Sequence, residues 1–379
     1  MKIAVFTDSF LPGSGGTERA VYNVCKSFKN LGHEIIVFAP DYHSDWETDE
    51  IEVYRVRSIK LNHNDMAAVV GWEYRKILKK VKKFAPDIIY YCTISMMAGC
   101  AIKIAKKLKV PLTATVHTKF KESFYDSTKS KFITYCVIKS LVAKLNRTEL
   151  VTTVSQDMKS ELSSYGYRGA VKVIKNGVTD PCTPVCGGKG EIKGTVNFIF
   201  CGRLSKIKNV QFSIKSLAIL KREKNFKNFT FTVVGRGPYL KSLKRLARRE
   251  NVFENVVFAG FVGGRKEMSA CYRKAHLLLF PSLFDNDSLV ILEAAEHGVP
   301  AVTLKGCGSS ERITDGVNGF LADNDERKFA DKIYEIVTNK ALYAKVSANA
   351  HTVLADSWDK TAEKYIDVFA PLCENCKNE

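Results

Sequence analysis

Residues 281–298 read PSLFDNDSLVILEAAEHG, and this stretch decides the fold. It follows the apolar run HLLLF at 276–280, which is typical of a buried strand, and a short acidic loop then leads to a helix that begins near Ser288. The loop between a strand and a helix N-terminus is where an open α/β sheet binds an anion. Asp285 and Glu293 are spaced to bind hydroxyls on either side of that anion. Phosphate held by backbone N–H groups and hydroxyls held by carboxylates describe a nucleotide sugar.

Length and composition predict two folded domains. The chain has 379 residues, too many for one ordinary core, and hydrophobic residues make up 45% of it. No stretch of about 18 apolar residues occurs, so no segment is expected to span a bilayer. The opening, MKIAVFTDSF at 1–10, has the pattern of a buried strand and a polar turn, and it lacks the basic start and long apolar run of a signal peptide. We therefore expect a cytoplasmic protein.

Strand and helix patterns alternate along the whole chain. Such alternation implies parallel sheets with right-handed crossovers, that is, doubly wound α/β domains. Strands are expected at 2–6, 34–38, 87–91, 112–116, 150–154, 171–174, 196–201, 229–234, 256–258, 276–280 and 301–303. Helices are expected at 17–31, 74–84, 97–108, 131–145, 156–165, 210–222, 238–249, 288–296 and 358–372. The expected domain boundaries are 1–178, a linker at 179–194, 195–356, and a C-terminal helical segment at 357–372.

The cysteine pattern favours reduced thiols. The eleven cysteines are odd in number, and most of them lie inside strand or helix patterns. Two close pairs leave an alternative open. If the C-terminal end folds back to the linker, Cys182 and Cys186 could meet Cys373 and Cys376 around a zinc ion.

The positive charge is unevenly distributed. The net charge is +18, and residues 51–147 alone hold 20 Lys and Arg against 6 Asp and Glu. Residues 131–147, KFITYCVIKSLVAKLNR, mix bulky apolar side chains with cations, as a helix at a membrane interface does. An amphipathic helix packed on its own domain has the same pattern, so both interpretations stay open. No nucleic-acid recognition motif accompanies the charge, which argues against a nucleic-acid partner.

Two turns in the first half suit a binding site. The first strand runs into LPGSGGTER at 11–19, where glycines allow a ligand to approach the backbone just before a helix. This loop is not the GxGxxG fingerprint of dinucleotide-binding enzymes. His117 follows the strand at 112–116, at the carboxyl end where ligand sites of parallel sheets form.

The second half repeats this arrangement. The strand at 196–201 gives way to GRLSKIKN at 202–209, which places Arg203 and Lys208 after a glycine turn. Two cations at such a turn suit the oxygens of a bound anion. VVGRGP at 233–238 and AGFV at 259–262 follow two further strands.

Together these motifs resemble the retaining glycosyltransferases of family 4. The matching features are the Gly-Gly-x-Glu loop at Gly15, Gly16 and Glu18, the His117 turn, Asn176-Gly177-Val178 before the linker, the Arg203–Lys208 pair, and the signature in which two acidic residues are separated by seven others. Asp285 stands in the first acidic position, where most members have Glu, and Ser288 stands where many have Gly. The resemblance implies the GT-B fold, two Rossmann-like domains facing each other across a cleft, with a C-terminal helix that crosses back to the first domain.

The resemblance also implies residue roles. His117 and Asp285 would contact the transferred sugar, and Asp287 could share the role of Asp285. Arg203 and Lys208 would bind the diphosphate. The resemblance assigns the ribose hydroxyls to Glu293. The remaining residues implied in nucleotide-sugar binding are Gly15, Gly16, Gly235, Phe261, Val262, Ser288 and Leu289.

We therefore expect a hexosyltransferase that moves a hexose from a UDP-sugar to a hydroxyl acceptor without a metal or other cofactor. The favoured donor is UDP-glucose, from which glucose would be transferred. The expected acceptor is a lipid or a lipid-linked glycan in envelope or surface-polysaccharide synthesis, and the basic N-terminal domain would then meet an anionic membrane at its inner face. A soluble sugar or sugar-phosphate acceptor and a catalytically inactive nucleotide-sugar binder are the alternatives.

Overall fold

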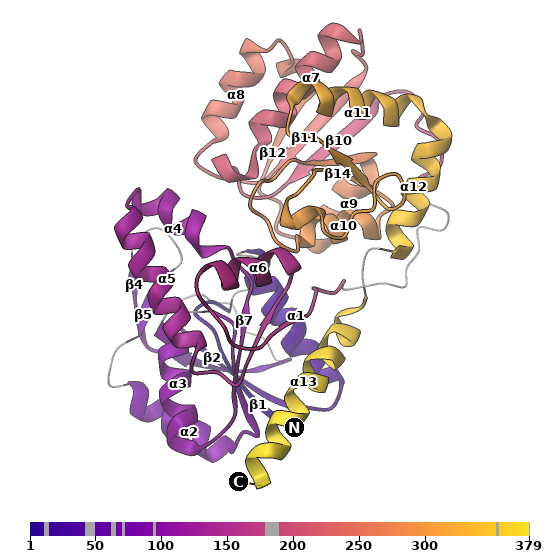
Figure 1. The fold of residues 1–379 in the computed structure, drawn as a ribbon. Coiled ribbons are helices and arrows are strands. Elements are labelled where there is room, and N and C mark those ends of the chain that lie inside the picture. Colours follow the sequence, from indigo (N-terminus) through magenta and orange to yellow (C-terminus); the bar gives the residue numbers. More distant parts are fainter. Residues whose placement is uncertain are drawn as a thin grey trace. The chain divides into compact units, whose positions relative to one another are not determined.

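Two parallel sheets, each with its own helices, form the two units of the chain (Figure 1). The computed structural model describes residues 1–10, 15–41, 50–61, 66–69, 73–93, 96–178, 189–353 and 356–378. The first unit comprises Met1–Gly177 and Ser357–Glu379, and the second comprises Val178–Asp356.

The first unit contains a seven-stranded sheet in which every pairing is parallel. Its strands are, in order across the sheet, β3 (Glu52–Val56), β2 (Glu34–Pro40), β1 (Lys2–Phe6), β6 (Ile88–Tyr91), β7 (Leu112–Val116), β8 (Leu150–Thr153) and β9 (Val171–Val173). A separate antiparallel pair consists of β4 (Ser58–Leu61) and β5 (Met66–Val69). The order reverses between β1 and β6, so ligands are expected at the carboxyl ends of these strands.

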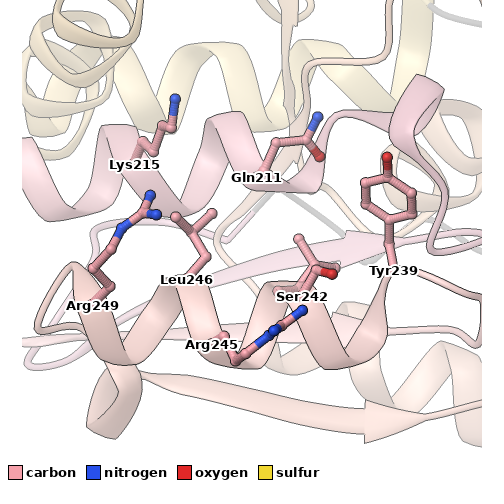
Figure 2. A pocket seen from close by; sticks show the side chains of 8 residues that line it. Gln211, Lys215, Tyr239, Ser242, Arg245, Leu246 and Arg249 are labelled. Atoms are coloured by element: carbon pink, nitrogen blue, oxygen red, sulfur yellow. The ribbon is translucent and has the colours of Figure 1, made fainter.

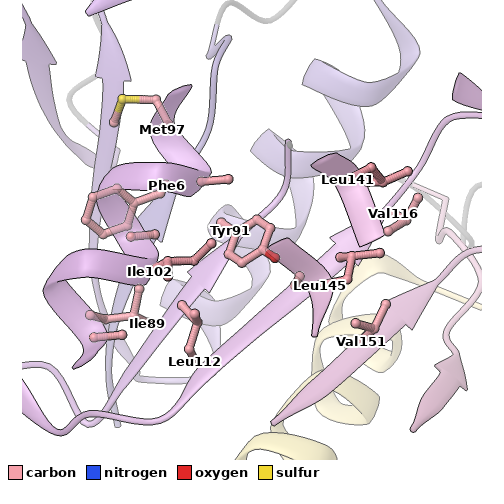
Figure 3. Close-up of a cluster of buried hydrophobic side chains, with 14 of the residues drawn as sticks. Phe6, Ile89, Tyr91, Met97, Ile102, Leu112, Val116, Leu141, Leu145 and Val151 are labelled. Atoms are coloured by element: carbon pink, nitrogen blue, oxygen red, sulfur yellow. The ribbon is translucent and has the colours of Figure 1, made fainter. Parts of the chain in front are cut away.

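Helices cover both faces of this sheet, which explains its almost continuous apolar strands. They are α1 (Gly16–Asn30), α2 (Glu73–Phe84), α3 (Met96–Leu108), α4 (Phe120–Thr128), α5 (Lys131–Leu145), α6 (Gln156–Ser164) and α13 (Trp358–Asn378). On one face Tyr91 packs with residues of α3 and α5 in a buried hydrophobic cluster (Figure 3). Its neighbour Tyr90 points to the other face, as successive strand residues do, and packs against Tyr365 of α13 with the rings tilted by 49° and their centroids 5.8 Å apart.

The second unit contains a six-stranded parallel sheet. Its strands are, in order, β12 (Val256–Gly260), β11 (Phe229–Val234), β10 (Val196–Cys201), β13 (Leu277–Phe280), β14 (Ala301–Leu304) and β15 (Phe320–Ala322). Its helices are α7 (Val210–Glu223), α8 (Leu240–Arg249), α9 (Arg265–Lys274), α10 (Leu289–Glu296), α11 (Glu326–Thr338) and α12 (Lys340–Val353). The order reverses between β10 and β13, the doubly wound pattern with its switch point at these two strands.

The predicted fold class, two doubly wound α/β domains, is confirmed. The structure adds elements that the sequence analysis missed: the strands β3, β4, β5 and β15 and the helices α4, α9, α11 and α12. Among the described residues, no helix is both long enough and apolar enough to cross a membrane.

Candidate functional site

The switch point of the second unit brings together two of the predicted motifs. Residues 202–209 follow β10, and residues 281–288 follow the adjacent strand β13. Both loops leave the same edge of the sheet because the strands are parallel. The backbone N–H of Leu283 donates to the carbonyl of Ile207 at 3.4 Å, and Asn209 donates its side-chain amide to the carbonyl of Pro281 at 3.2 Å. The two loops therefore form one hydrogen-bonded surface.

Lys208 and Asp285 form an ion pair across this surface. Their side chains are only 22% and 19% exposed, so solvent screens the pair less than it would a surface contact. The Lys208 ammonium also lies 5.7 Å from the centre of the Phe280 ring. The second carboxylate oxygen of Asp285 is buried and, among the described residues, accepts no hydrogen bond. This oxygen of Asp285 can therefore accept a hydrogen bond from a ligand hydroxyl.

Arg203 lies at the same edge but in a different environment. Its side chain is exposed, whereas the following residue, Leu204, is fully buried and anchors the turn. An exposed guanidinium at the edge that also holds the half-buried Lys208–Asp285 pair can reach an incoming anion without first breaking a contact in the turn.

Gly235 is required by the packing of two loops. Its φ is +142°, and a Cβ atom added there would lie 1.9 Å from the carbonyl oxygen of Gly202. Its N–H donates to the carbonyl of Gly260 at 2.7 Å. The turns that follow β10, β11 and β12 are thus locked together, so Gly235 shapes the site whether or not it touches a ligand.

Phe261 provides an exposed ring at the end of β12. It is 52% exposed, and the Arg236 guanidinium lies 4.7 Å from its ring centre. The next residue, Val262, is half-buried. An exposed aromatic ring with a cation stacked on it is a suitable surface for a planar base.

Helix α10 begins where the sequence predicted, with Ser288 as its N-cap and Leu289 as its first residue. The Ser288 side chain makes no capping hydrogen bond, and no acidic residue occupies the first turn. The first-turn N–H groups and the helix dipole therefore favour an anion at this end. Glu293 lies one turn further along and is half-buried.

Glu293 is held by α9, a helix that the sequence analysis did not predict. The hydroxyl of Tyr272 donates to a carboxylate oxygen of Glu293 at 3.2 Å. His297 stacks on the Tyr272 ring at 5.6 Å, and one of its ring nitrogens lies 2.6 Å from the hydroxyl of Ser269. Lys189 secures the end of α9, since its ammonium donates to the carbonyl of Tyr272 at 2.8 Å, and burial lowers the pKa of Lys189 to about 8.

Asp287 holds the loop between β13 and α10 in place. It forms a doubly bonded ion pair with Arg312, and the two side chains are 3% and 10% exposed. The resemblance to family 4 let Asp287 share the sugar-binding role of Asp285, and no sequence pattern pointed to Arg312. With both carboxylate oxygens engaged by the guanidinium, Asp287 anchors the residues between Asp285 and Ser288.

The first unit holds the remaining predicted residues at the corresponding edge of its own sheet. Gly15 is the N-cap of α1, and its backbone is extended. A Cβ atom on Gly15 would lie 2.5 Å from the Glu18 carboxylate, whereas one on Gly16 would meet nothing within 4 Å. Among the described residues, none therefore covers the position above Gly16.

His117 follows β7, and its turn is tied to α6. Lys119 forms ion pairs with Asp157 and with Glu161, 3.7 Å away in the second case. The Nε2 atom of His117 is buried, and burial lowers the pKa of the imidazole to about 4. The ring is therefore neutral at pH 7 and can accept or donate a hydrogen bond without bringing a charge.

The zinc alternative is not tested by the structure. Cys182 and Cys186 lie outside the described residues. Cys373 is buried and donates to the carbonyl of Asp87 at 3.5 Å, while the exposed Cys376 lies 3.1 Å from the carbonyl of Lys109. In the part of the chain that the structure describes, no group of three or more His, Cys, Asp or Glu residues is arranged to hold a metal ion.

The second unit thus gathers, at one sheet edge, two cations, an open helix N-terminus, two carboxylates and an exposed ring. This set can bind a diphosphate between Arg203, Lys208 and the α10 N-terminus. The carboxylates of Asp285 and Glu293 are available for hydroxyls.

Comparison with known proteins agrees with this geometry. The family model described as glycosyl transferases group 1 matches residues 188–353, and that described as glycosyltransferase family 4 matches residues 14–180. The alpha-monoglucosyldiacylglycerol synthases of Streptococcus pneumoniae and Acholeplasma laidlawii are 24% and 21% identical, over 96% and 99% of this chain and 83% and 96% of theirs. A GDP-mannose-dependent alpha-mannosyltransferase of Corynebacterium glutamicum is 24% identical, over 98% of this chain and 90% of its own.

Solved structures show the same fold. Anabaena HepE, solved with UDP, has a TM-score of 0.77 and 20% identity, covering 98% of this chain and all of its own. Sucrose-phosphate synthase of Thermosynechococcus elongatus has a TM-score of 0.78 and 16% identity, covering 98% of both chains. The chain belongs to the group 1 glycosyltransferases of family 4, and it is a hexosyltransferase with the GT-B fold.

Proposed function

We propose that this enzyme is a retaining, metal-independent glucosyltransferase that moves glucose from UDP-glucose to a hydroxyl of a lipid or a lipid-linked glycan. The observation that carries the proposal is the Lys208–Asp285 ion pair at the switch point of the second unit. A cation suited to phosphate oxygens and a carboxylate suited to sugar hydroxyls lie side by side in this pair, which supports the proposal.

Donor binding would exchange partners within this pair. The diphosphate pairs with the Lys208 ammonium, and the Asp285 carboxylate then accepts hydrogen bonds from hydroxyls of the sugar. Arg203 and the N-terminus of α10 bind the remaining phosphate oxygens. Glu293 accepts hydrogen bonds from the two ribose hydroxyls. Once the donor is bound, its phosphates and hydroxyls hold these groups in place, so they stabilise the developing charge with little further reorganisation.

The reaction breaks the bond between the anomeric carbon and the diphosphate oxygen. The acceptor oxygen forms its bond to that carbon on the same face, and its proton passes to the departing phosphate oxygen. Negative charge grows on the diphosphate as the bond breaks, so Arg203 and Lys208 bind the transition state more strongly than the ground state. In this scheme the two cations do the work of a metal ion.

A lipid acceptor is supported by the relatives that synthesise glucosyldiacylglycerol and by the surface of α5. Phe132, Ile133 and Tyr135 are 75%, 47% and 59% exposed near the start of this helix. Lys131 and Lys139 on the same helix are exposed, and the Lys139 ammonium lies 5.4 Å from the centre of the Tyr135 ring. Bulky apolar side chains between lysines suit an anionic membrane interface, so we place the enzyme at the inner face of the cell membrane.

The direct test is donor turnover by the purified chain. UDP or GDP release is measured with UDP-glucose, UDP-galactose, UDP-N-acetylglucosamine and GDP-mannose, with EDTA present, and with or without diacylglycerol vesicles. We expect vesicle-dependent release from UDP-glucose that Glu293→Ala abolishes. Release only with a soluble sugar acceptor would move the acceptor to that class. Binding of UDP without turnover on any acceptor would identify an inactive nucleotide-sugar binder, which the Asp at position 285 makes the specific alternative.

A further inference from the structure

The second unit holds a groove between α7 and α8 that plays no part in the donor site (Figure 2). Its volume is about 440 Å³, within the range of small-molecule sites. Its lining includes Gln211, Lys215, Tyr239, Leu243, Arg245 and Arg249. In Figure 2 they come from the two facing helices and from the turn before α8.

The charge of the groove is of one sign. Lys215, Arg245 and Arg249 line it, and none of the lining residues is acidic. Lys215 pairs with Glu326 at 3.0 Å, and Arg249 pairs with Glu250 at 3.2 Å. The lysine and arginine side chains of these pairs are 42% and 71% exposed, and ion pairs at the surface exchange partners at little cost. The groove therefore favours an anion.

The floor of the groove is apolar. Leu243 is 2% exposed, and Leu246 and the ring of Tyr239 complete the wall. Inorganic phosphate would gain nothing from these side chains. An anion with an organic part would bury that part against them.

Gln211 adds a specific requirement. Its amide nitrogen donates to the carbonyl of Lys206 at 3.3 Å and to the side-chain oxygen of Asn209 at 2.9 Å, which fixes the orientation of the amide. The amide oxygen is buried and, among the described residues, receives no hydrogen bond. A buried acceptor of this kind destabilises the fold until a donor reaches it. A ligand hydroxyl would supply that donor.

We propose that the α7–α8 groove binds a small organic phosphate that carries a hydroxyl. The phosphate lies between Arg245 and Arg249, which are one turn apart on α8, and the organic part covers Leu243 and Tyr239. The hydroxyl donates to Gln211. Because the Gln211 amide also donates to the carbonyl of Lys206, a ligand bound to Gln211 is linked to the turn that carries Lys208.

The experiment measures binding of 4-hydroxyphenyl phosphate to the full chain by isothermal titration calorimetry. Arg245→Gln with Arg249→Gln removes the two groove cations. Lys241→Gln with Arg248→Gln removes the same charge from the same helix at residues that do not line the groove. We expect the groove variant to bind at least tenfold more weakly than the control variant. Any binding at the Arg203–Lys208 loops is common to both variants and cancels in the comparison.

A lipid phosphomonoester presents the same head group, so vesicles carrying phosphatidic acid form a second arm. Weaker binding of the soluble probe with unchanged vesicle recruitment assigns the groove to a free organic phosphate. Loss of both assigns it to a lipid head group. Equal affinity of the two double variants for the soluble probe overturns the proposal, because the attraction would then be general positive charge.

Discussion

The hydroxyl of Tyr272 on α9 donates to the carboxylate of Glu293 on α10 at 3.2 Å. Tyr272 is 1% exposed, and His297 stacks on its ring. The carboxylate that the proposed function assigns to the ribose is thus oriented by a buried side chain before any ligand arrives. Such preorganisation reduces the entropy that donor binding must lose.

Tyr272→Phe is expected to weaken UDP binding about 5- to 10-fold, because the loss of one hydrogen bond to a charged acceptor costs roughly 1–1.5 kcal/mol. Glu293→Ala should weaken it further, by about 2–3 kcal/mol, because both ribose hydroxyls lose their acceptor. Calorimetric titration with UDP measures both effects.

Tyr343→Phe is the matched control for Tyr272→Phe. Tyr343 is also fully buried in the second unit, but its hydroxyl donates to the carbonyl of His276 at 3.2 Å. Its loss should lower the melting temperature and leave UDP affinity unchanged. If both tyrosine variants bind UDP equally well, Tyr272 has a structural role only.

Arg203→Ala should lower kcat more than it raises KM, because the charge that Arg203 meets develops as the diphosphate leaves. Activity should also persist in EDTA. Steady-state kinetics with chelated and metal-supplemented enzyme test both expectations. Strict dependence on added Mg²⁺ or Mn²⁺ would show that the two cations do not stabilise the diphosphate by themselves.

Sequence alone identified those parts of the site that lie in short, local patterns. The turns after β10 and β13 carry Arg203, Lys208 and Asp285, and parallel strand order brings them to one edge. It missed the partners that come from elsewhere in the chain. Arg312 is 25 residues from Asp287, and Tyr272 is 21 residues from Glu293, so no local periodicity links them.

The elements missed in the fold have similar causes. The strand β15 has three residues, fewer than a reliable alternating pattern needs. The helix α9, Arg265–Lys274, has only Tyr272 buried, so its sequence looks like a polar loop. Its contact with α10 becomes visible only in three dimensions.

Gly235→Ala and Gly16→Ala should have opposite effects on stability. A methyl group on Gly235 would meet the Gly202 carbonyl at 1.9 Å in a backbone that already has positive φ, so we expect a loss of at least about 3 kcal/mol. Gly16 begins α1, and among the described residues nothing lies within 4 Å of a Cβ atom placed there, so alanine should be neutral or stabilise by about 0.5–1 kcal/mol. Urea unfolding measures both. If Gly16→Ala keeps its stability and loses activity, a ligand approaches the backbone there.

Acid should destabilise the protein through His117. Burial lowers its pKa from 6.5 to about 4, so between these pH values the unfolded chain binds a proton that the folded chain does not. Stability contributed by the neutral ring is therefore complete above pH 6.5 and lost progressively as the pH falls toward 4, by up to about 3 kcal/mol. Thermal unfolding of the native protein and His117→Asn, compared across this range, should show a steeper decline for the native protein. Parallel curves would contradict a buried neutral imidazole.

The last prediction concerns the start of α5. If Phe132, Tyr135 and the adjacent lysines meet a bilayer, the enzyme should co-sediment with vesicles containing anionic lipid and not with neutral ones. Binding should fall as salt rises, because screening limits surface charge to about 8 Å at physiological ionic strength.

Replacing Lys129, Lys131 and Lys139 with Glu should release the enzyme from anionic vesicles and leave UDP binding intact. These three side chains are exposed, whereas Lys144 is half-buried and burial lowers its pKa, so Lys144 is left unchanged. The control replaces the exposed Lys82, Lys83 and Lys106 of α2 and α3 with Glu, which changes the charge of the same unit equally. Phe132→Ser should weaken binding at every salt concentration, because its contribution is apolar. If both charge variants lose vesicle binding equally and Phe132→Ser has no effect, vesicle binding depends only on the overall positive charge of the first unit. That result would favour a soluble acceptor.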